Sequence, residues 1–103
     1  MIAFTVMYPD EPGRRFDMEY YREKHLALVK EKVGGALKGV SLETGLSGPA
    51  PGSPAAYRVV ARLLFDRIED IGTYMAPHVP AFDADVPNFT DLTPQFQINE
   101  VVM

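Results

Sequence analysis

The sequence predicts an α+β fold of the ferredoxin-like βαββαβ type, a four-stranded antiparallel sheet with both helices on one face. Three observations lead to this prediction: four segments show the alternation of a strand, two show the spacing of a helix, and their order is strand, helix, strand, strand, helix, strand. The chain has 103 residues, of which 47% are hydrophobic, and a net charge of -4. This length and composition favour a single domain over residues 1–103, with a core that needs no disulfide.

The first strand is expected over residues 2–8, where apolar side chains occupy both alternating faces. A strand that is apolar on both faces is typical of a central position in its sheet. Pro9, Pro12 and Gly13 then predict a loop that reaches Phe16, because proline restricts the backbone and lacks an amide hydrogen.

The first helix is expected to begin after Asp17, a residue type that caps helix N-termini well. Phe16 is expected to pack back onto Tyr21 as a hydrophobic staple. Apolar residues then recur at three- and four-residue steps up to Val33, which predicts an amphipathic helix of about four turns. The pair Gly34-Gly35 is expected to end it.

The second half of the chain begins with two strands, expected within residues 37–46 and 57–65. The stretch 47–54, rich in glycine, proline and serine, predicts the loop between them.

The second helix is expected to start with Asp66 and Glu69 as a capping box and to share one apolar face among Ile68, Ile71 and Met75. Pro77 and Pro80 predict a break or kink in this helix, followed by a short helical turn within 78–85. A final strand is expected over 96–102.

The sheet face without helices is expected to be too apolar to meet water. It would carry the following residues or their alternates: Arg58, Val60, Arg62, Leu64 and Val101. A second copy of the chain would cover this face, so we expect a symmetric homodimer.

Composition excludes several classes of function. The chain has no cysteine, which removes disulfides, thiolate metal sites and cysteine nucleophiles. Acidic residues outnumber basic ones, 14 to 10, so nucleic acid is not an expected partner. No apolar run is long enough to cross a membrane, and the N-terminus lacks the features of a signal peptide, so we expect a cytoplasmic protein. His25 and His78 are the only imidazoles and form no metal-ligand spacing, and no glycine-rich phosphate loop is present.

Several runs of residues resemble the EthD family, which is named after ether-degradation gene clusters. The runs are Tyr8-Pro9-Asp10-Glu11-Pro12-Gly13, Phe16-Asp17-Met18-Glu19-Tyr20-Tyr21, Lys24-His25-Leu26-Ala27-Leu28-Val29 and Asp85-Val86-Pro87-Asn88-Phe89-Thr90-Asp91, followed by Pro94 and the Gln97-Ile98 strand. The resemblance implies a dimeric α+β barrel, in which two such sheets close face to face. It implies no common reaction. Ala27 stands where proline is common and Phe89 where tyrosine is usual, so this chain lacks that hydroxyl.

His25 is the leading candidate for chemistry, because it lies on the apolar face of the first helix, one turn after Tyr21. Burial disfavours the charged imidazole, and a neutral one could act as general base toward a phenol or a carbon beside a carbonyl. The alternative is a histidine of the core whose two nitrogens are satisfied by the backbone or by a tyrosine.

Three further residues are candidates for the same site. Tyr8 and Tyr21 could donate hydrogen bonds to a developing oxyanion, or could simply pack with their hydroxyls at a wet edge. His78, in the kinked segment, could be a second acid or base, or an exposed loop histidine. Asp85, Asn88 and Thr90 are expected to make local turns.

These residues leave three hypotheses for the function. The first is a cofactor-independent enzyme with His25 as base, for which the resemblance to dimeric α+β barrels implies a reaction of the monooxygenase, cyclase or isomerase type on an aromatic or polyketide-like substrate. The second is a non-catalytic accessory protein that binds a small apolar molecule or a partner in an oxidative degradation pathway. The third is a dimer in which the motif only builds the fold. We expect no cofactor. Haem binding stays an open alternative, because some related barrels bind haem through a histidine on a helix.

Overall fold

The computed structural model describes all 103 residues and has one antiparallel sheet. Its strands are β1 (Ile2–Pro9), β2 (Gly39–Thr44), β3 (Tyr57–Phe65) and β4 (Gln95–Glu100), in the spatial order β2-β3-β1-β4. The predicted βαββαβ order and the central position of the first strand are confirmed, since β1 pairs with β3 on one side and β4 on the other.

The first helical segment runs without a break through α1 (Met18–Tyr20), the π-helical turn η1 (Tyr21–His25) and α2 (Leu26–Val33). The Asp17 side chain caps it by accepting a hydrogen bond from the Tyr20 amide at 3.0 Å, as predicted. Gly34 ends α2 with φ 69° and ψ -143°, a backbone conformation that essentially only glycine adopts. A short 3-10 turn, η2 (Gly34–Ala36), then leads toward β2.

The second helical segment is divided into shorter pieces, the last three of which each have a proline near their start. These pieces are α3 (Ile68–Asp70), the π-helical turn η3 (Ile71–Met75), the 3-10 turn η4 (Ala76–His78), α4 (Val79–Asp85) and the 3-10 turn η5 (Val86–Asn88). The predicted kink and the short helix after it are therefore confirmed.

Two details of this segment were predicted wrongly. The N-cap is Arg67, without a capping side chain, and Asp66 instead lies 3.8 Å from the Lys38 ammonium. Ile68 is 52% exposed, so the buried stripe begins only at Ile71.

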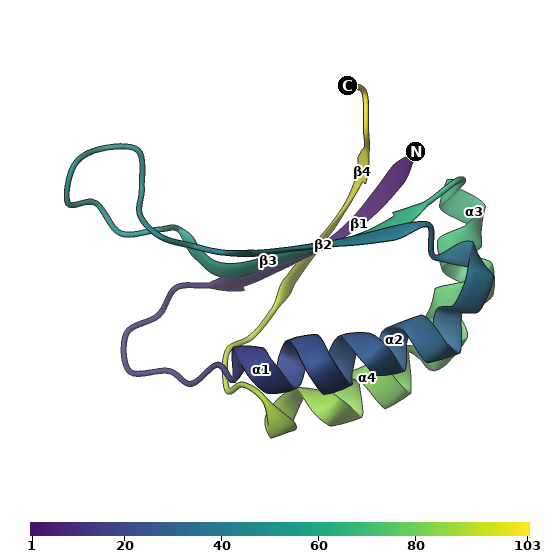
Figure 1. Ribbon diagram of the computed structural model, residues 1–103, viewed down its shortest axis with the longest axis horizontal. Helices are drawn as coiled ribbons and strands as arrows, with labels where there is room; N and C mark the ends of the chain where they lie inside the picture. Colours follow the sequence, from purple (N-terminus) through teal and green to yellow (C-terminus); the bar gives the residue numbers. More distant parts are fainter.

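Both helical segments lie on the same side of the sheet (Figure 1). The core lies between these helices and the sheet. The two central strands contribute alternate residues to it, including Val6, Tyr8, Val59, Leu63 and Phe65. Because directly paired residues share a face, pairs such as Phe4 with Leu63 and Val6 with Ala61 point toward the helices.

The other face of the sheet has no helix over it. Its centre carries Met7 paired with Val60 and Ala3 paired with Leu64, and Arg62 is joined to Glu43 at 2.9 Å. Arg58 does not remain on this face as a free charge, because its guanidinium binds Asp10 at 3.0 Å and the carbonyls of Glu11 and Arg14. Val101 lies beyond the end of β4. No helix has the length and apolar character that crossing a membrane requires.

Candidate functional site

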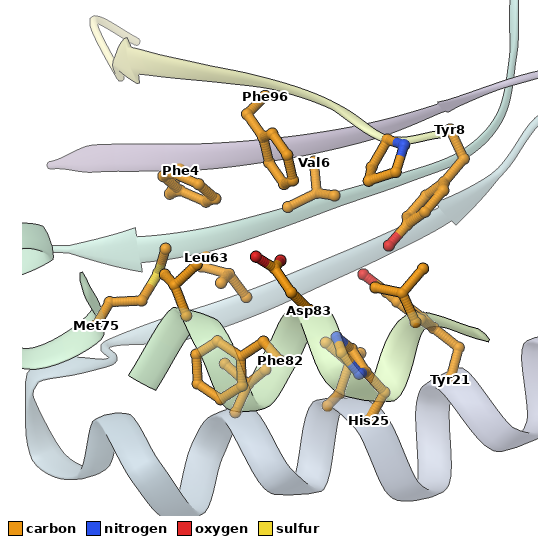
Figure 2. Close-up of a pocket in the computed structure, with 15 residues that line it drawn as sticks. Phe4, Val6, Tyr8, Tyr21, His25, Leu63, Met75, Phe82, Asp83 and Phe96 are labelled. Atoms are coloured by element: carbon orange, nitrogen blue, oxygen red, sulfur yellow. The ribbon is translucent and has the colours of Figure 1, made fainter. Parts of the chain in front are cut away.

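A cavity of about 290 Å³ lies between the helices and the sheet (Figure 2). Its lining comes from β1, β3, both helical segments, the entry to β4 and β4 itself. The lining residues are Phe4, Val6, Tyr8, Tyr21, His25, Leu26, Val29, Leu63, Met75, Val79, Phe82, Asp83, Val86, Pro94 and Phe96. This largely apolar surface with a few polar groups has the character of a small-molecule site.

His25 lines the cavity from the π-helical turn η1. This turn starts at Tyr21 and ends at His25, and the two rings stack with centroids 5.2 Å apart and planes inclined by 19°. The His25 side chain is only 9% exposed, and its ring centroid lies 4.7 Å from that of Phe89. These two ring contacts therefore restrict the orientation of the imidazole.

The Nδ1 atom of His25 lies 2.8 Å from the Oδ2 atom of Asp85, at the end of α4. An ionised carboxylate only accepts hydrogen bonds, so Nδ1 must carry the hydrogen that it donates. In the neutral ring, Nε2 is then left with a free lone pair. The pair of residues has the arrangement of a base and the carboxylate that orients it.

Two further side chains hold Asp85 in place. The Tyr20 hydroxyl donates to its Oδ1 atom at 2.6 Å, and the Asn88 amide donates to the same atom at 2.9 Å. Partial burial alone would raise the pKa of Asp85, but the hydrogen bonds from Tyr20, Asn88 and His25 outweigh burial and lower it. The hydrogen bond that Tyr20 donates to Asp85 is also the main reason why the pKa of Tyr20 is raised. Asp85 therefore remains a carboxylate beside His25 at neutral pH.

The hydroxyls of Tyr8 and Tyr21 point toward one another at one end of the cavity (Figure 2). Their rings meet edge to face with centroids 5.8 Å apart. Burial raises the pKa of Tyr21 to about 12, although the neighbouring Tyr8 hydroxyl opposes the rise. Burial also raises the pKa of Tyr8 far above its ordinary value, and the nearby Tyr21 adds to that rise. Both phenols are therefore protonated hydrogen-bond donors at neutral pH.

The segment after α4 is locked to the loop that precedes α1. The Arg15 amide donates to Asp91 at 2.8 Å, and the Thr90 hydroxyl donates to the Arg15 carbonyl at 2.6 Å. The hydrogen bond from the Arg15 amide is the largest reason why the pKa of Asp91 is lowered. Between these contacts Phe89 is fully buried against His25 and Tyr21.

The structure brings together three of the four predicted site residues, namely Tyr8, Tyr21 and His25. His78 is not among the lining residues, and its ring lies 6.4 Å from that of Phe82. Asn88 and Thr90 do make the expected local contacts, to Asp85 and to the Leu92 amide.

Sequence reasoning missed two carboxylates and one tyrosine of the site. Asp85 was expected to serve a local turn, yet it contacts His25 across 60 positions of sequence. Asp83 and Tyr20 were not singled out, although Tyr20 shares the resembling motif with Tyr21. The available signal was that Asp85 lies within the last resembling run.

The polar groups of the cavity suit proton transfer better than metal binding. No group of three or more histidine, aspartate or glutamate side chains is placed to hold a metal ion. The free lone pair of Nε2 can accept a proton, and the tyrosine hydroxyls can donate to an oxygen that gains charge.

Comparison with known proteins gives a family and a fold. The model of the EthD domain matches residues 13–93. The structure of an EthD-like protein from Ralstonia eutropha JMP134 is 37% identical, with a TM-score of 0.93 over 99% of this chain and 92% of that one. The structure of an EthD family protein from Bacillus halodurans C-125 is 18% identical, with a TM-score of 0.71 over 99% of each chain.

A more distant match shows the same fold in a protein described as dimeric. This ferredoxin-like protein from Thermobifida fusca YX is 13% identical, with a TM-score of 0.57 over 97% of this chain and 90% of that one. No curated protein matches the chain significantly. The extent of the domain match and the likeness to the Ralstonia protein show that the chain belongs to the EthD domain family.

Proposed function

We propose that the chain binds a small aromatic or polyketide-like molecule in the cavity and removes a proton from it with His25 as general base. The observation that carries this proposal is the hydrogen bond between His25 and Asp85 at the wall of an otherwise apolar cavity. This proton transfer is the step that the residues of the cavity could supply to a reaction of the monooxygenase, cyclase or isomerase type.

The proton transfer uses the groups that line the cavity. An O–H bond, or a C–H bond beside a carbonyl, breaks in the ligand, and an N–H bond forms at Nε2 of His25. The electron pair stays on the ligand as a phenolate or enolate, to which one of the paired hydroxyls of Tyr8 and Tyr21 donates while the other donates within the pair. Asp85 stabilises the imidazolium that results, because its carboxylate already accepts the Nδ1 hydrogen.

The second candidate is a non-catalytic binding protein of an oxidative degradation pathway. Hydrophobic side chains form 12 of the 15 lining residues, a composition that would bind an apolar molecule without any reaction. The two functions differ in what they require of His25, since binding alone needs only its shape.

Proton exchange separates the two functions. Phenols and enolisable ketones are incubated with the protein in deuterated water, and loss of the α-proton signal of each ketone is followed by NMR, while binding of each compound is followed by titration. The first function predicts that His25→Gln abolishes the catalysed exchange and retains binding. Binding without catalysed exchange in the wild type would leave the accessory function, and no binding of any compound would contradict both.

His78→Gln is the matched comparison, because it makes the same chemical change outside the lining of the cavity. We expect it to retain exchange if His25 is the sole histidine base. Loss of exchange in this variant alone would move the role of base to His78.

We also propose that the chain forms a homodimer through the sheet face without helices. The apolar centre of this face, around Met7, Val60 and Leu64, has no other cover. Solved structures that share the fold include proteins described as dimeric. Two copies packed through this face would form the closed barrel that the sequence resemblance implied.

A further inference from the structure

Asp83 is the only carboxylate among the residues that line the cavity. It lies on α4, two residues before Asp85, and its side chain points toward the space between α4 and the sheet (Figure 2). The residue is exposed, and no hydrogen bond or ion pair uses its carboxylate, whereas Asp85 is fully engaged. Asp83 is therefore a free acceptor at the boundary between the cavity and water.

The charges around the cavity are all of one sign. No lysine or arginine lines it, and the Asp85 carboxylate behind His25 adds a second negative charge. Asp83 is close enough to the inner end for its charge to contribute to the raised pKa of Tyr8, after burial and the effect of Tyr21. A bound anion would thus meet like charge and no cation to pair with.

Resting on the proposed function, we propose that Asp83 is a specificity-determining residue. It makes the cavity select uncharged aromatic ligands that carry a hydroxyl group over the corresponding carboxylates. A hydroxyl of the ligand has an acceptor at Asp83, while a carboxylate ligand would lose water and meet like charge there, with only the tyrosine hydroxyls to donate to it.

The volume of the cavity suits a ligand of about two fused rings. An apolar cavity of about 150 Å³ in another protein is known to bind benzene. The cavity of about 290 Å³ in this chain is roughly twice as large. A matched pair of probes is therefore 2-naphthol, which is uncharged at pH 7, and 2-naphthoate, which is an anion of nearly the same shape.

The experiment compares dissociation constants of both probes for the wild type, Asp83→Asn and Glu31→Gln, measured by calorimetry at low salt. We expect the wild type to prefer 2-naphthol by about tenfold or more, since the like charge of Asp83 repels a bound carboxylate. Asp83→Asn keeps an acceptor oxygen but removes the charge, so its preference should fall several-fold, mainly through tighter binding of 2-naphthoate. Glu31→Gln makes the same change of charge at an exposed site on α2 outside the cavity lining and should leave the preference unchanged.

The outcomes separate this inference from the proposed function. If both probes bind but Asp83→Asn keeps the wild-type preference, Asp83 does not set specificity, although the proposed function stands. An equal fall in Glu31→Gln would show a general effect of net charge and would overturn the inference as well. If neither probe binds the wild type, the proposed function fails for ligands of this size and the inference fails with it. Circular dichroism of each variant confirms that the fold is retained.

Discussion

Asp85 connects two parts of the chain that meet only in the folded state. Its carboxylate accepts hydrogen bonds from Tyr20 and His25 of the first helical segment and from Asn88 of its own segment. Its side chain is 15% exposed, so water replaces these donors poorly. A carboxylate with three donors and little access to water stabilises both the ring of His25 and the contact between the segments.

We predict that Asp85→Asn destabilises the protein by about 1–3 kcal/mol at pH 7, because charge-assisted hydrogen bonds are lost. The pKa of Asp85 is lowered in the folded state, so its contribution is present above its ordinary value of 3.8 and is lost as the pH falls through the lower folded-state pKa. The difference between variant and wild type should therefore shrink as the pH falls below about 4. Urea unfolding at pH 7 and pH 3 measures it.

Asp83→Asn is the matched control for this prediction. The same chemical change two residues earlier removes no hydrogen bond, so the free energy of unfolding should change by less than about 0.5 kcal/mol. Equal losses in both variants would show that the hydrogen bonds of Asp85 are not the cause.

The two cavity tyrosines predict an alkaline transition. The folded-state pKa of each is raised, so the stability that the neutral phenols provide is complete below the ordinary value of 10. It is lost as the pH rises from there through about 12, the folded-state pKa of Tyr21. The wild type should lose stability over this range, and the double variant Tyr8→Phe/Tyr21→Phe should lose less. Unfolding midpoints between pH 8 and pH 12 test this, and parallel curves would contradict it.

At the scale of residues, the sequence indicated those parts of the site that share one element. Tyr21 and His25 could be placed together because residues four apart lie on one face of a helix. Tyr8 followed from the expectation that this face meets the sheet. Asp85 could not be placed, because no local pattern specifies which turn of a distant, proline-broken helix will meet His25.

At the scale of elements, the helix that carries the site has clear ends. Asp17 caps its start, and Gly34 ends it with a positive φ of 69°. Gly35 is the next residue, has no positive φ and likewise has open space where a side chain would begin. The two glycines therefore differ in backbone conformation and not in the room around them.

We predict that Gly34→Ala lowers the free energy of unfolding by about 1–3 kcal/mol, because an alanine side chain strains this backbone conformation. Gly35→Ala should be neutral or stabilise the protein by up to about 1 kcal/mol, since it restricts the unfolded chain without strain. Chemical denaturation of both variants tests this prediction. A similar loss in both would mean that backbone strain at Gly34 is not the cause.

The start of the second helix shows where local patterns lose to tertiary contacts. Asp66 and Glu69 fit a capping box, but the helix begins one residue later and Asp66 lies beside Lys38. Across the first turn, Arg67 donates to Asp70 instead, at 3.2 Å. The π-helical turns were also beyond prediction, because hydrophobic spacing does not distinguish them from an ordinary helix.

At the scale of the whole molecule, the free sheet face should control assembly. Val60 lies at the centre of that face, paired with Met7 and Glu43. We predict that wild-type protein is dimeric by analytical ultracentrifugation and that Val60→Lys is monomeric. Burying an ammonium at the interface would be costly even opposite Glu43, which already pairs with Arg62, whereas on the free face of the monomer it is solvated.

Leu46→Lys is the control for this prediction. Leu46 is 91% exposed, in the loop between β2 and β3, and the same change of charge there should leave the dimer intact. A wild type that sediments as a monomer would contradict the proposed interface.

The cavity and the free face lie on opposite sides of one sheet that is a single backbone layer thick. The sheet therefore separates the two, and along each strand alternate residues face the cavity side and the free face. The residues whose substitution changes dimer formation are therefore different from those whose substitution changes ligand specificity. A subunit that has dissociated from the dimer should therefore retain its cavity. The fraction of cavities that hold ligand should not change when dilution shifts the protein from dimer to monomer.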